Sequence, residues 1–437
     1  MFMYFKILLT KHFKQVKEGG IRTILKKLTS LFFVFVQLPI YLISIPTFVI
    51  IILVRPWYLI RWNVLNAGRI GHFALYTELY CCERDAKINL PKQRYKDLFY
   101  LSKVSSNRAL EKMWSRSITI LPRWLLKPIH MIGNFFYSTL GKKNIHEINS
   151  PANEDRDIHN LLEKFSSHIR FTEEEENNGK NFLEKLGLPP NAKFVCLIVR
   201  DAGYLKRHEK TPNDERWSYH NYRDGDIEKY VVAAEELASR GYYVFRMGIN
   251  VLKPLKSANP KVIDYANIGI RSDFIDVYLG AKCSFCVSTA CGFDAVPAIF
   301  RRPIAFIAAP IGSFFTSNKN FLLLTKHHIN KLTKKELSIS EIFLSNVSMA
   351  WSAEVFKDNN IELRENTPDE IRDLVIEMDE RISGNWRITD EDSSLQNFFW
   401  LTYEKCIHNL KLYQKMHGKI KAKFSARYLR NNKNFIN

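Results

Sequence analysis

The sequence predicts an α/β protein whose central part is a doubly wound parallel sheet. Between Phe194 and Pro310, short apolar runs alternate with segments in which apolar residues recur at helical spacing, such as Asp226–Arg240. Strands that alternate with helices of this length need crossover connections, which give parallel sheets. The predicted strands are Val195–Val199, Tyr242–Phe245, Val262–Tyr265, Phe285–Ser288 and Ile304–Ala308.

Polar residues follow these apolar runs, at the ends where open parallel sheets bind their ligands. An arginine fork suits phosphate oxygens, so Arg200 and Arg246 are candidate anion contacts. A salt bridge within its own loop explains Arg200 equally well. Because Gly248 has no side chain, a ligand could come close to the backbone there. The other candidates at these ends are Asp201, Asp264, Tyr265, Ser288, Thr289 and Gly292.

The turn from Ser288 to Gly292 joins a predicted strand to a short helix. Backbone amides at such a turn can bind a diphosphate. The alternative is an ordinary strand-to-helix cap. Just before the helix that begins near Asp226 stand His220, Tyr222 and Arg223, whose side chains could face a cleft.

A second, smaller α/β domain is expected before these strands. A short strand, Asn63–Leu65, is followed by the glycine turn Gly68–Phe73 and the helix Ala74–Cys82, an order that lets a helix N-terminus meet an anion. Arg69, Gly71 and His72 lie in this turn. His72 is either a general base or donor to a substrate, or a histidine that hydrogen-bonds its own loop. Further strands are expected at Asp97–Leu101 and Ile118–Leu121.

A capped helix marks the boundary between the two domains. Thr172 precedes four glutamates, and Gly187 with Pro189 and Pro190 ends the helix. Further helices are predicted at Asp369–Asp379 and Leu395–Met416. We therefore expect a basic amphipathic segment over residues 1–30, a hydrophobic membrane segment over 31–54, domains over 55–189 and 190–395, and a C-terminal helix with a basic tail over 396–437.

The charge is uneven along the 437 residues, whose formal net charge is +19. Much of the excess lies in residues 1–30 and 411–437, beside a long apolar run in the first case. Basic ends of this kind favour an anionic membrane surface, and the tail could return to it. A nucleic-acid binder would instead need a basic stripe on its folded surface, so no nucleic acid is expected as a partner.

The apolar run from Leu31 to Val54 contains no charged residue. As a helix it would reach about 36 Å, enough to cross a bilayer. Pro39 and Pro46 interrupt it, and Arg55 and Arg61 make its far flank basic as well. These features favour a re-entrant segment with both ends cytoplasmic over a single span.

Metal and cofactor signals are weak. The seven cysteines are odd in number, and Cys283 and Cys286 form a single C-x2-C without a second pair. The two Asp-x-Asp matches, at residues 155–157 and 390–392, follow no predicted strand. No P-loop, zinc-protease helix or G-x-S-x-G occurs. We expect neither a metal nor a cofactor.

As a set, several stretches between Asn63 and Trp351 resemble a family of bacterial GT-B-type glycosyltransferases associated with surface-polysaccharide (O-antigen or capsule) gene clusters. These stretches are RIGHFALYTE, VRDAGYL, HNYRDGDIEKY, GYYVFRMG, IDYAN, DVYLGAKCSFCVSTACG and VPAIFRRPI. The resemblance implies two Rossmann-like domains that face a cleft, a sugar-nucleotide donor and no obligatory metal.

The resemblance also implies site roles. The second domain would hold the donor, with Arg200, Arg246, Gly248, Ser288, Thr289 and Gly292 at its diphosphate and Asp264 or Tyr265 at its nucleoside. The acceptor side would include Arg69, Gly71, His220, Tyr222 and Arg223. His72 is the first choice for a catalytic base and Asp201 the second. Many GT-B enzymes hold the ribose with a glutamate after the glycine turn, whereas Phe293 and Asp294 follow Gly292 here.

The expected function is thus a membrane-associated, metal-independent glycosyltransferase of hexosyl or deoxyhexosyl type. It would move a sugar from a nucleotide-sugar donor to a lipid-linked or growing surface glycan, at the cytoplasmic face of the bacterial inner membrane. One alternative is a non-catalytic GT-B-like binding or scaffold protein of a polysaccharide assembly complex. Another is phosphoryl-type transfer to a membrane polyol.

Overall fold

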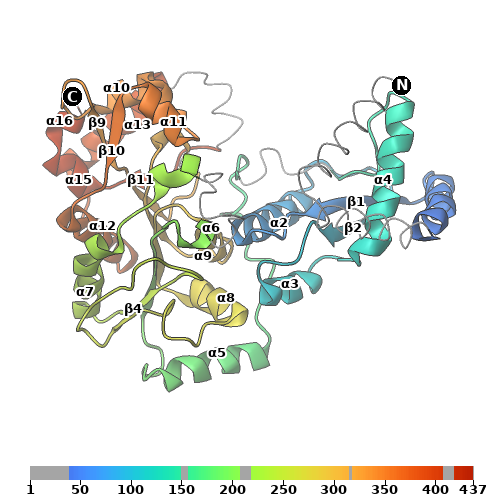
Figure 1. Ribbon diagram of the computed structural model, residues 1–437, viewed down its shortest axis with the longest axis horizontal. Helices are drawn as coiled ribbons and strands as arrows, with labels where there is room; N and C mark the ends of the chain where they lie inside the picture. Colours follow the sequence, from blue (N-terminus) through green and yellow to red (C-terminus); the bar gives the residue numbers. More distant parts are fainter. Residues whose placement is uncertain (1–38, 149–155, 207–217, 314–316, 407–417, 437) are drawn as a thin grey trace, which may run out of the picture. The chain divides into compact units, whose positions relative to one another are not determined.

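A computed structural model describes residues 39–148, 156–206, 218–313, 317–406 and 418–436 (Figure 1). The expected N-terminal segment over residues 1–30 lies outside these ranges. The chain forms two compact units. Unit 1 consists of Met1–Val64, Pro91–Ser102 and Ile118–Ile148, and unit 2 of Leu65–Leu90, Lys103–Ser117 and Asn149–Asn437. This partition does not follow the boundary expected between residues 189 and 190.

Unit 2 is built on a seven-stranded sheet with the order β11-β8-β7-β6-β3-β4-β5, in which every described pair is parallel. The parallel α/β sheet expected from the sequence is confirmed. The strands are β3 (Phe194–Ile198), β4 (Tyr243–Arg246), β5 (Val262–Ile263), β6 (Phe285–Ser288), β7 (Ile304–Ile307), β8 (Phe321–Leu324) and β11 (Lys423–Phe424).

The helices that flank these strands begin at conventional caps. The side chain of Asp226 accepts from the amide of Glu228 ahead of η2 (Ile227–Tyr230), which continues into α7 (Val231–Ser239). Capping boxes start α5 (Glu173–Lys185) at Thr172 and α12 (Pro368–Ile382) at Thr367. The other helices on this part of the chain are α6 (Gly203–Lys206), η1 (Ser218–Arg223), α8 (Asp273–Lys282), η3 (Gly292–Asp294), α9 (Ala295–Ile299) and η4 (Ile311–Ser313).

The core of unit 2 follows the sheet. Strands β3, β6, β7 and β8 are buried at every residue, so both faces of the sheet are covered. Cys196, Cys283 and Cys286 lie inside this core as free thiols. Burial raises the pKa of Cys196 and of Cys286 well above its ordinary value, so these residues act as small apolar side chains.

The first helix of unit 2, α2 (Ile70–Asp85), packs against α9, and α3 (Arg108–Ser115) packs against α8. These contacts explain why residues 65–90 and 103–117 cluster with the large sheet. The expected first domain from residue 55 to 189 combined them with unit 1 because they are close in sequence.

Unit 1 has a small sheet among the residues that the structure describes. Strands β1 (Leu59–Leu65) and β2 (Tyr95–Leu101) form a two-stranded sheet. The expected strand Ile118–Leu121 is reduced to a single bridge, Phe99 to Ile120, because Pro122 follows and α4 (Arg123–Thr139) begins. A helix over residues 39–54 and α4 pack on a core that includes Phe48, Trp62 and Tyr137.

The C-terminal part of the chain belongs to unit 2. Its elements are the antiparallel pair β9 (His327–Asn330) and β10 (Ile361–Arg364), and the helices α10 (Ile339–Leu344), η5 (Asn346–Met349), α11 (Ala353–Asp358), α13 (Asp390–Cys406), α15 (Ala426–Asn431) and α16 (Lys433–Ile436). The predicted helix over 369–379 is confirmed within α12. That over 395–416 is seen only as far as Cys406, because residues 407–417 lie outside the description.

The basic tail, which the sequence allowed to return to a membrane, is folded into unit 2 over residues 418–436. Strand β11 pairs with β8, and Phe424, Leu429 and Phe435 are buried in the core of unit 2. The tail alternates basic and apolar residues, and the apolar ones complete the edge of the sheet while the basic ones face outward or pair with acids such as Glu380.

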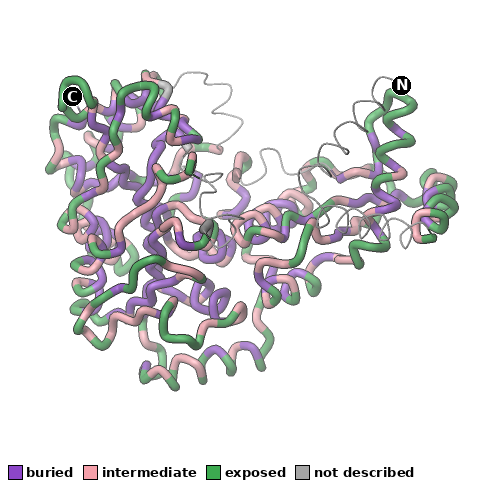
Figure 2. The backbone as a smooth tube through the Cα atoms, viewed as in Figure 1, coloured by how far each residue is buried: buried purple, intermediate pink, exposed green. Residues whose placement is uncertain are grey.

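Among the residues that the structure describes, no helix combines the length and the apolar character needed to cross a membrane. The first eight residues of the expected hydrophobic segment 31–54 lie outside those residues. The helix over residues 39–54 is mostly exposed, as Figure 2 shows.

Candidate active site

Three adjacent strands bring the predicted polar residues to one edge of the sheet in unit 2. Leu197 of β3 is level with Arg246 of β4, and Ile198 is level with Ser288 of β6. Residues 200–201, 246–248 and 288–292 therefore leave the sheet at neighbouring carboxyl ends. The sequence-based expectation that these stretches converge follows directly from parallel pairing.

Arg246 is fully buried at the end of β4 and lies between two carboxylates. Its Nη1 donates to Asp264 Oδ1 at 3.3 Å, and its Nη2 is 3.8 Å from Asp201 Oδ2. Burial lowers the pKa of Arg246, and the two carboxylates oppose that change. Its Nε has no hydrogen-bond partner among the described residues. Arg246 is thus a buried cation with unused donor capacity.

The two carboxylates beside Arg246 also fix the backbone around it. Asp201 accepts from the amides of Gly203 and Leu252, each at 2.8 Å. Asp264 accepts from the Leu255 amide at 2.9 Å and from the Asn267 side chain at 2.7 Å. Asp201 is therefore a loop-organising residue first, which weakens its case as a base. Gly248, at φ +152, begins the loop that these carboxylates hold.

Arg200 ties the end of β3 to η1. Its Nη1 donates to the carbonyl oxygen of His220 at 2.9 Å and pairs with the carboxylate of Asp224. The salt bridge between the two ends of the loop, which was the alternative interpretation of Arg200, is present, and its partner is Asp224. Burial lowers the pKa of Arg200 and raises that of Asp224.

A cluster of cations surrounds His220. Burial, together with the charges of Arg223, Arg200 and Arg69, lowers the pKa of His220 from 6.5 to about 4. The imidazole is therefore neutral at physiological pH, and its Nδ1 is buried without a hydrogen-bond partner among the described residues. Residues from α2, β3 and η1 thus concentrate positive charge at one place. We call Arg69, Arg200, Arg223 and His220 the arginine cluster.

Helix α2 begins beside this cluster, with Arg69 as its N-cap residue. Arg69 makes no side-chain cap hydrogen bond, and the first turn contains no acidic residue. An uncapped N-terminus presents free amides and the positive end of the helix dipole, which favours an anion.

The same helix start touches the turn after β6. A Cβ on Gly71 would lie 2.9 Å from the Cα of Gly292 and 3.0 Å from its carbonyl oxygen. The two backbones can approach only because both residues lack side chains. The sequence singled out both glycines separately, and the structure brings them together.

The side-chain hydroxyl groups of that turn already form hydrogen bonds within the protein. Ser288 donates to Asp294 Oδ2 at 2.8 Å and accepts from the Ala290 amide at 3.0 Å. Thr289 accepts from the Arg200 amide at 2.7 Å. Both side chains are buried. These hydrogen bonds fix the turn, as expected for the strand-to-helix cap that was the alternative interpretation. Any ligand contact by this turn would therefore come from its backbone.

Tyr265 is fully buried, and its hydroxyl donates to Asp276 Oδ1 at 3.2 Å while accepting from the Ser272 amide at 3.2 Å. A nucleoside could reach this side chain only if the packing around it changed. Burial raises the pKa of Asp276 to about 6, and Arg271 opposes that shift.

His72 lies in the first turn of α2 and stacks on Tyr76, with ring centroids 4.8 Å apart. The Asn66 amide nitrogen is 3.0 Å from His72 Nδ1. Because that nitrogen donates, Nδ1 accepts and the proton of the neutral ring is on Nε2. In this arrangement Nε2 is a hydrogen-bond donor. The hydrogen bond from Asn66 agrees with the alternative interpretation of His72 as a histidine that hydrogen-bonds its own loop.

A polar cavity of about 550 Å³ opens at the ends of β3 and β4, beside β10. This volume is typical of small-molecule sites. Its lining includes Asp201, Tyr222, Asp226, Arg246, Lys326 and Glu365. Arg223, the neighbour of Tyr222, instead points to the turn after β6 and donates to the Ala290 carbonyl.

Sequence reasoning missed Lys326. Its side chain is buried at the carboxyl side of β8, where Nζ donates to the backbone oxygens of Tyr222, at 3.1 Å, and Asp224. Burial lowers its pKa. The signal was a polar TKHH run directly after the apolar residues 321–324, and it was missed because no strand was predicted there.

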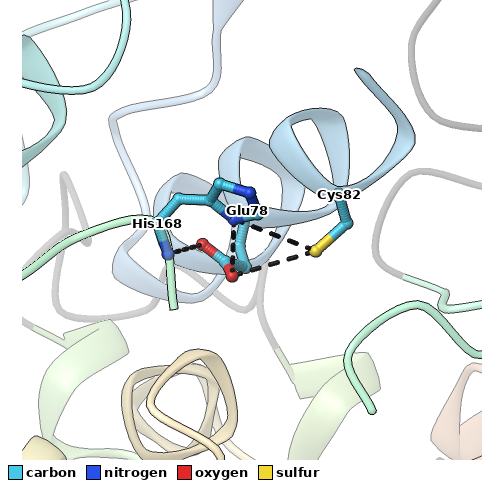
Figure 3. A group of neighbouring side chains, drawn as sticks. All are labelled: Glu78, Cys82 and His168. Atoms are coloured by element: carbon cyan, nitrogen blue, oxygen red, sulfur yellow. Dashed lines mark hydrogen bonds and ion pairs between the residues drawn. The ribbon is translucent and has the colours of Figure 1, made fainter. Parts of the chain in front are cut away.

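A second polar group in unit 2 resembles a metal site in its residue types. Figure 3 shows that the side chains of Glu78, Cys82 and His168 are neighbours. One possible ligand atom from each lies within 4.8 Å of the others. His168 Nδ1 is 3.0 Å from Glu78 Oε1, and Nε2 is 3.0 Å from Asp85 Oδ2. However, Arg301 pairs with the same Glu78 oxygen, and its Nη2 is 3.8 Å from Cys82 Sγ.

These contacts do not fit a metal ion. Burial raises the pKa of the Cys82 thiol, so in this arrangement the side chain is a neutral thiol. The guanidinium of Arg301 already supplies the positive charge that the buried Glu78 needs. We interpret the group as an ionic network inside unit 2.

No protein-family model matches the sequence, and no curated protein matches it. Solved structures show partial similarity. The glycosyl transferase family 9 protein of Veillonella parvula has a TM-score of 0.39 and 13% identity, covering 62% of this chain and 86% of that one. Escherichia coli ADP-heptose LPS heptosyltransferase II has a TM-score of 0.36 and 12% identity, and the match covers 61% of this chain and 90% of that one.

Escherichia coli heptosyltransferase WaaC, solved with ADP-2-deoxy-2-fluoro heptose, has a TM-score of 0.31 and 13% identity. The match covers 60% of this chain and 92% of that one. The described part of the chain by itself defines an α/β protein with a parallel sheet, a polar cavity and an arginine cluster at the carboxyl edge of that sheet.

Proposed function

We propose that the protein is a membrane-associated glycosyltransferase that needs no metal. It moves a sugar of hexosyl or deoxyhexosyl type from a nucleotide-sugar donor to a lipid-linked or growing surface glycan. The observation that carries this proposal is the arginine cluster. Burial, together with the charges of three arginines, lowers the pKa of His220 and keeps it neutral, and the residues beside the cluster line a cavity of about 550 Å³.

The chemistry explains why such a cluster suits sugar transfer. A nucleoside diphosphate gains negative charge as it leaves the sugar. Fixed guanidinium groups and backbone amides stabilise that charge without reorganising. The uncapped start of α2 and the turn after β6 add amides at the same place. In this proposal Arg69, Arg200 and Arg223 contact the diphosphate, and Arg246 and Lys326 face the rest of the donor in the cavity.

The acceptor hydroxyl must lose a proton during transfer. His72 remains our first candidate for the group that receives it, and Asp201 the second. With Asn66 donating to Nδ1, His72 Nε2 would first donate to the substrate, so service as a base requires the other tautomer. Asp201 already accepts hydrogen bonds from two backbone amides, so it is the weaker candidate.

The finer features stay part of this proposal. They are the two facing Rossmann-like domains of the GT-B type, the attachment of residues 1–54 to an anionic membrane, and a location at the cytoplasmic face of the bacterial inner membrane. The basic N-terminal sequence and the uncharged residues 31–54 support the membrane part.

The test is ligand-induced stabilisation of the full chain by UDP-, GDP-, CMP-, ADP- and dTDP-sugars. A ligand at a hundred times its Kd stabilises the fold by about 2.7 kcal/mol. We expect one nucleotide class to raise the Tm, and Arg223→Ala to abolish the rise. Arg240→Ala is the matched control, because Arg240 pairs with Glu236 and Asp379 away from the cavity.

Equal stabilisation of Arg223→Ala and the native chain would contradict the donor site, as would the absence of stabilisation by every sugar nucleotide. A mass shift of one sugar on a membrane-lipid acceptor would establish transfer. Binding without any transfer would instead favour the scaffold function.

A further inference from the structure

Unit 1 exposes far more apolar surface than unit 2. More than half of the exposed large apolar side chains among the described residues belong to unit 1, although it is the smaller unit. They gather on the helix over residues 39–54 with the turn that follows it, and on α4. Soluble proteins rarely expose a contiguous apolar patch of this kind unless it binds something.

The helix over residues 39–54 buries only a narrow stripe. Ser44, Phe48 and Ile51 are buried, and no residue of the helix is charged. A helix that is apolar all round belongs in a protein core or in contact with lipid. Its exposed large apolar residues are Leu42, Ile43, Ile45, Val49, Ile50, Leu53 and Val54.

Helix α4 has two apolar faces. Leu126, Ile129 and Tyr137 face the core of unit 1. On the outside, Trp124, Met131 and Phe135 follow one another at intervals of seven and four residues, which is one stripe of a helix. Phe135 is 73% exposed. The inner face explains the fold, whereas the side chains of Trp124 and Phe135 on the outer face are mostly exposed.

The two helices are in direct contact. The Tyr41 hydroxyl is 3.3 Å from Met131 Sδ, and the rings of Phe48 and Phe136 meet edge to face with centroids 5.7 Å apart. Their exposed sides therefore belong to one surface of unit 1. We call it the apolar surface and define it as the exposed side chains of residues 39–58 and of α4.

The charge around the apolar surface is mainly positive. Among the described residues of unit 1, the acidic side chains are Asp97, which is held by Arg61 at 2.7 and 2.8 Å, and Glu147, which is 3.6 Å from His130 of α4. Basic residues stand at the helix ends: Arg55 follows the first helix, Arg123 begins α4 and Lys142 follows it. Trp57 and Trp124, both strongly exposed, are of the type that occupies membrane interfaces.

We propose that α4 is a second lipid-contacting helix, which enters the interface of an anionic bilayer together with residues 39–54. The apolar side chains would lie among the acyl chains, and Arg55, Arg123 and Lys142 among the phosphate head groups. This proposal rests on the membrane association proposed above, which involved residues 1–54 only, and not on sugar transfer.

Charge distinguishes the bilayer from two other occupants of the apolar surface. A second copy of unit 1 would bring a second set of basic residues against the first. Residues 1–38 of the chain contain a single acid, Glu18, among their lysines and arginines, so they would also repel it. An anionic lipid surface offers the apolar contact and the opposite charge together.

The first test compares lipid binding of full-length variants. Vesicles of phosphatidylcholine with phosphatidylglycerol are floated with the native chain, Phe135→Asp and Leu332→Asp. Leu332 is the matched control, since it is 75% exposed in unit 2. We expect Phe135→Asp to weaken binding by about tenfold or more and Leu332→Asp to leave it unchanged. Vesicles of phosphatidylcholine alone should bind every variant less.

The second test locates the contact. A fluorescent dye is attached to Phe135→Cys or to Leu332→Cys, with the unsubstituted chain as the background, and nitroxide-bearing lipids are added. Quenching at position 135 alone supports the proposal. A dye at 135 that is shielded without lipid, or disulfide-linked dimers of Phe135→Cys, would mean that residues 1–38 or a second copy cover the surface, which overturns it.

The two proposals can fail separately. If Phe135→Asp binds lipid as well as the native chain and its dye is not quenched, α4 does not contact lipid. Stabilisation of the same variant by a sugar nucleotide would leave the proposed function intact. Loss of that stabilisation in Arg223→Ala, with lipid binding unchanged, would show that the two surfaces work independently.

Discussion

The Cα of Gly292 lies 2.9 Å from the position where a Cβ would stand on Gly71. These residues are far apart in sequence, yet they let the start of α2 meet the turn after β6 inside unit 2. Both stretches belong to the proposed diphosphate site, so the spacing of its backbone amides depends on this one contact.

Gly71→Ala should therefore damage both fold and binding. The added methyl group must displace backbone, and overpacking of this kind typically costs about 1–3 kcal/mol. We expect a lower free energy of unfolding, measured by urea denaturation, and loss of stabilisation by sugar nucleotides. Gly68→Ala in the same turn is the control, because its Cβ would come no closer than 3.5 Å to Lys103. Equal effects of both substitutions would contradict this account.

The pKa of His220 should depend directly on the positive charge of the arginine cluster. Burial and three arginines lower its pKa to about 4. Replacing Arg223 by alanine removes the largest of the three arginine charge effects, so the pKa of His220 should rise toward its ordinary 6.5. An NMR titration of the imidazole measures this shift. Arg240→Ala should leave the pKa of His220 where it is.

The same lowered pKa makes folding depend on pH. The unfolded chain binds a proton at His220 below about pH 6.5, whereas the folded chain does so only near pH 4. This contribution to stability is thus fully present above pH 6.5 and is lost as the pH falls from 6.5 through 4. His220→Gln should lose less stability over that interval than the native chain in parallel thermal melts. An identical slope would contradict the burial of His220.

Asn66 should set the tautomer of His72. As an amide it donates to Nδ1 at 3.0 Å. Asn66→Asp replaces the donor by an acceptor, which puts the ring proton on Nδ1 and leaves Nε2 able to accept. If His72 acts as a base through Nε2, this variant should keep or raise kcat, and Asn66→Ala, which leaves both tautomers open, should not lower it. The ¹⁵N shifts of the ring distinguish the tautomers whatever the activity.

The buried network around Glu78 should be structural. Arg301→Leu leaves the fully buried Glu78 carboxylate without its guanidinium, and loss of one partner of a buried pair typically costs about 3–5 kcal/mol. The double variant Glu78→Leu/Arg301→Leu should be more stable than Arg301→Leu alone. Added zinc should not change the Tm of the native chain. Zinc-dependent stabilisation lost in Cys82→Ser would make it a metal site after all.

His168 gives this network the opposite pH dependence. Glu78 and Asp85 raise the pKa of His168 despite its burial. Its contribution is therefore fully present below pH 6.5 and is lost as the pH rises through the higher folded pKa. His168→Gln should flatten the stability profile on that side only, as measured by urea denaturation at several pH values.

The strands of unit 2 were predictable because their signal is local. Each buried strand, such as Ile304–Ile307, is a short apolar run bounded by turn residues. Strand β11 was not predicted, because two residues carry no period and only its pairing with β8 makes it a strand. Lys326 was missed for a related reason, since its place in the site depends on β8.

The positions of the site residues could be predicted from the sequence, but their hydrogen-bond partners could not. Arg200, Arg246, Ser288 and Thr289 stand where the strand ends predicted. The hydroxyl of Thr289 accepts from the Arg200 amide, and the hydroxyl of Tyr265 donates to Asp276. The spacing of residues in the sequence does not reveal these distances. A polar residue at a strand end is a candidate ligand contact only if it keeps donors or acceptors that the protein does not already use.

The sequence by itself determined the parallel α/β sheet, the polar edge and the uneven charge, because apolar period, turn residues and charge are properties of neighbouring residues. Only the tertiary structure decided which unit α2 joins, that the C-terminal tail completes a sheet, and that α4 turns a second apolar face outward. These outcomes depend on partners far along the chain, such as Glu78 and Arg301, whose pairing is fixed by packing and not by local pattern.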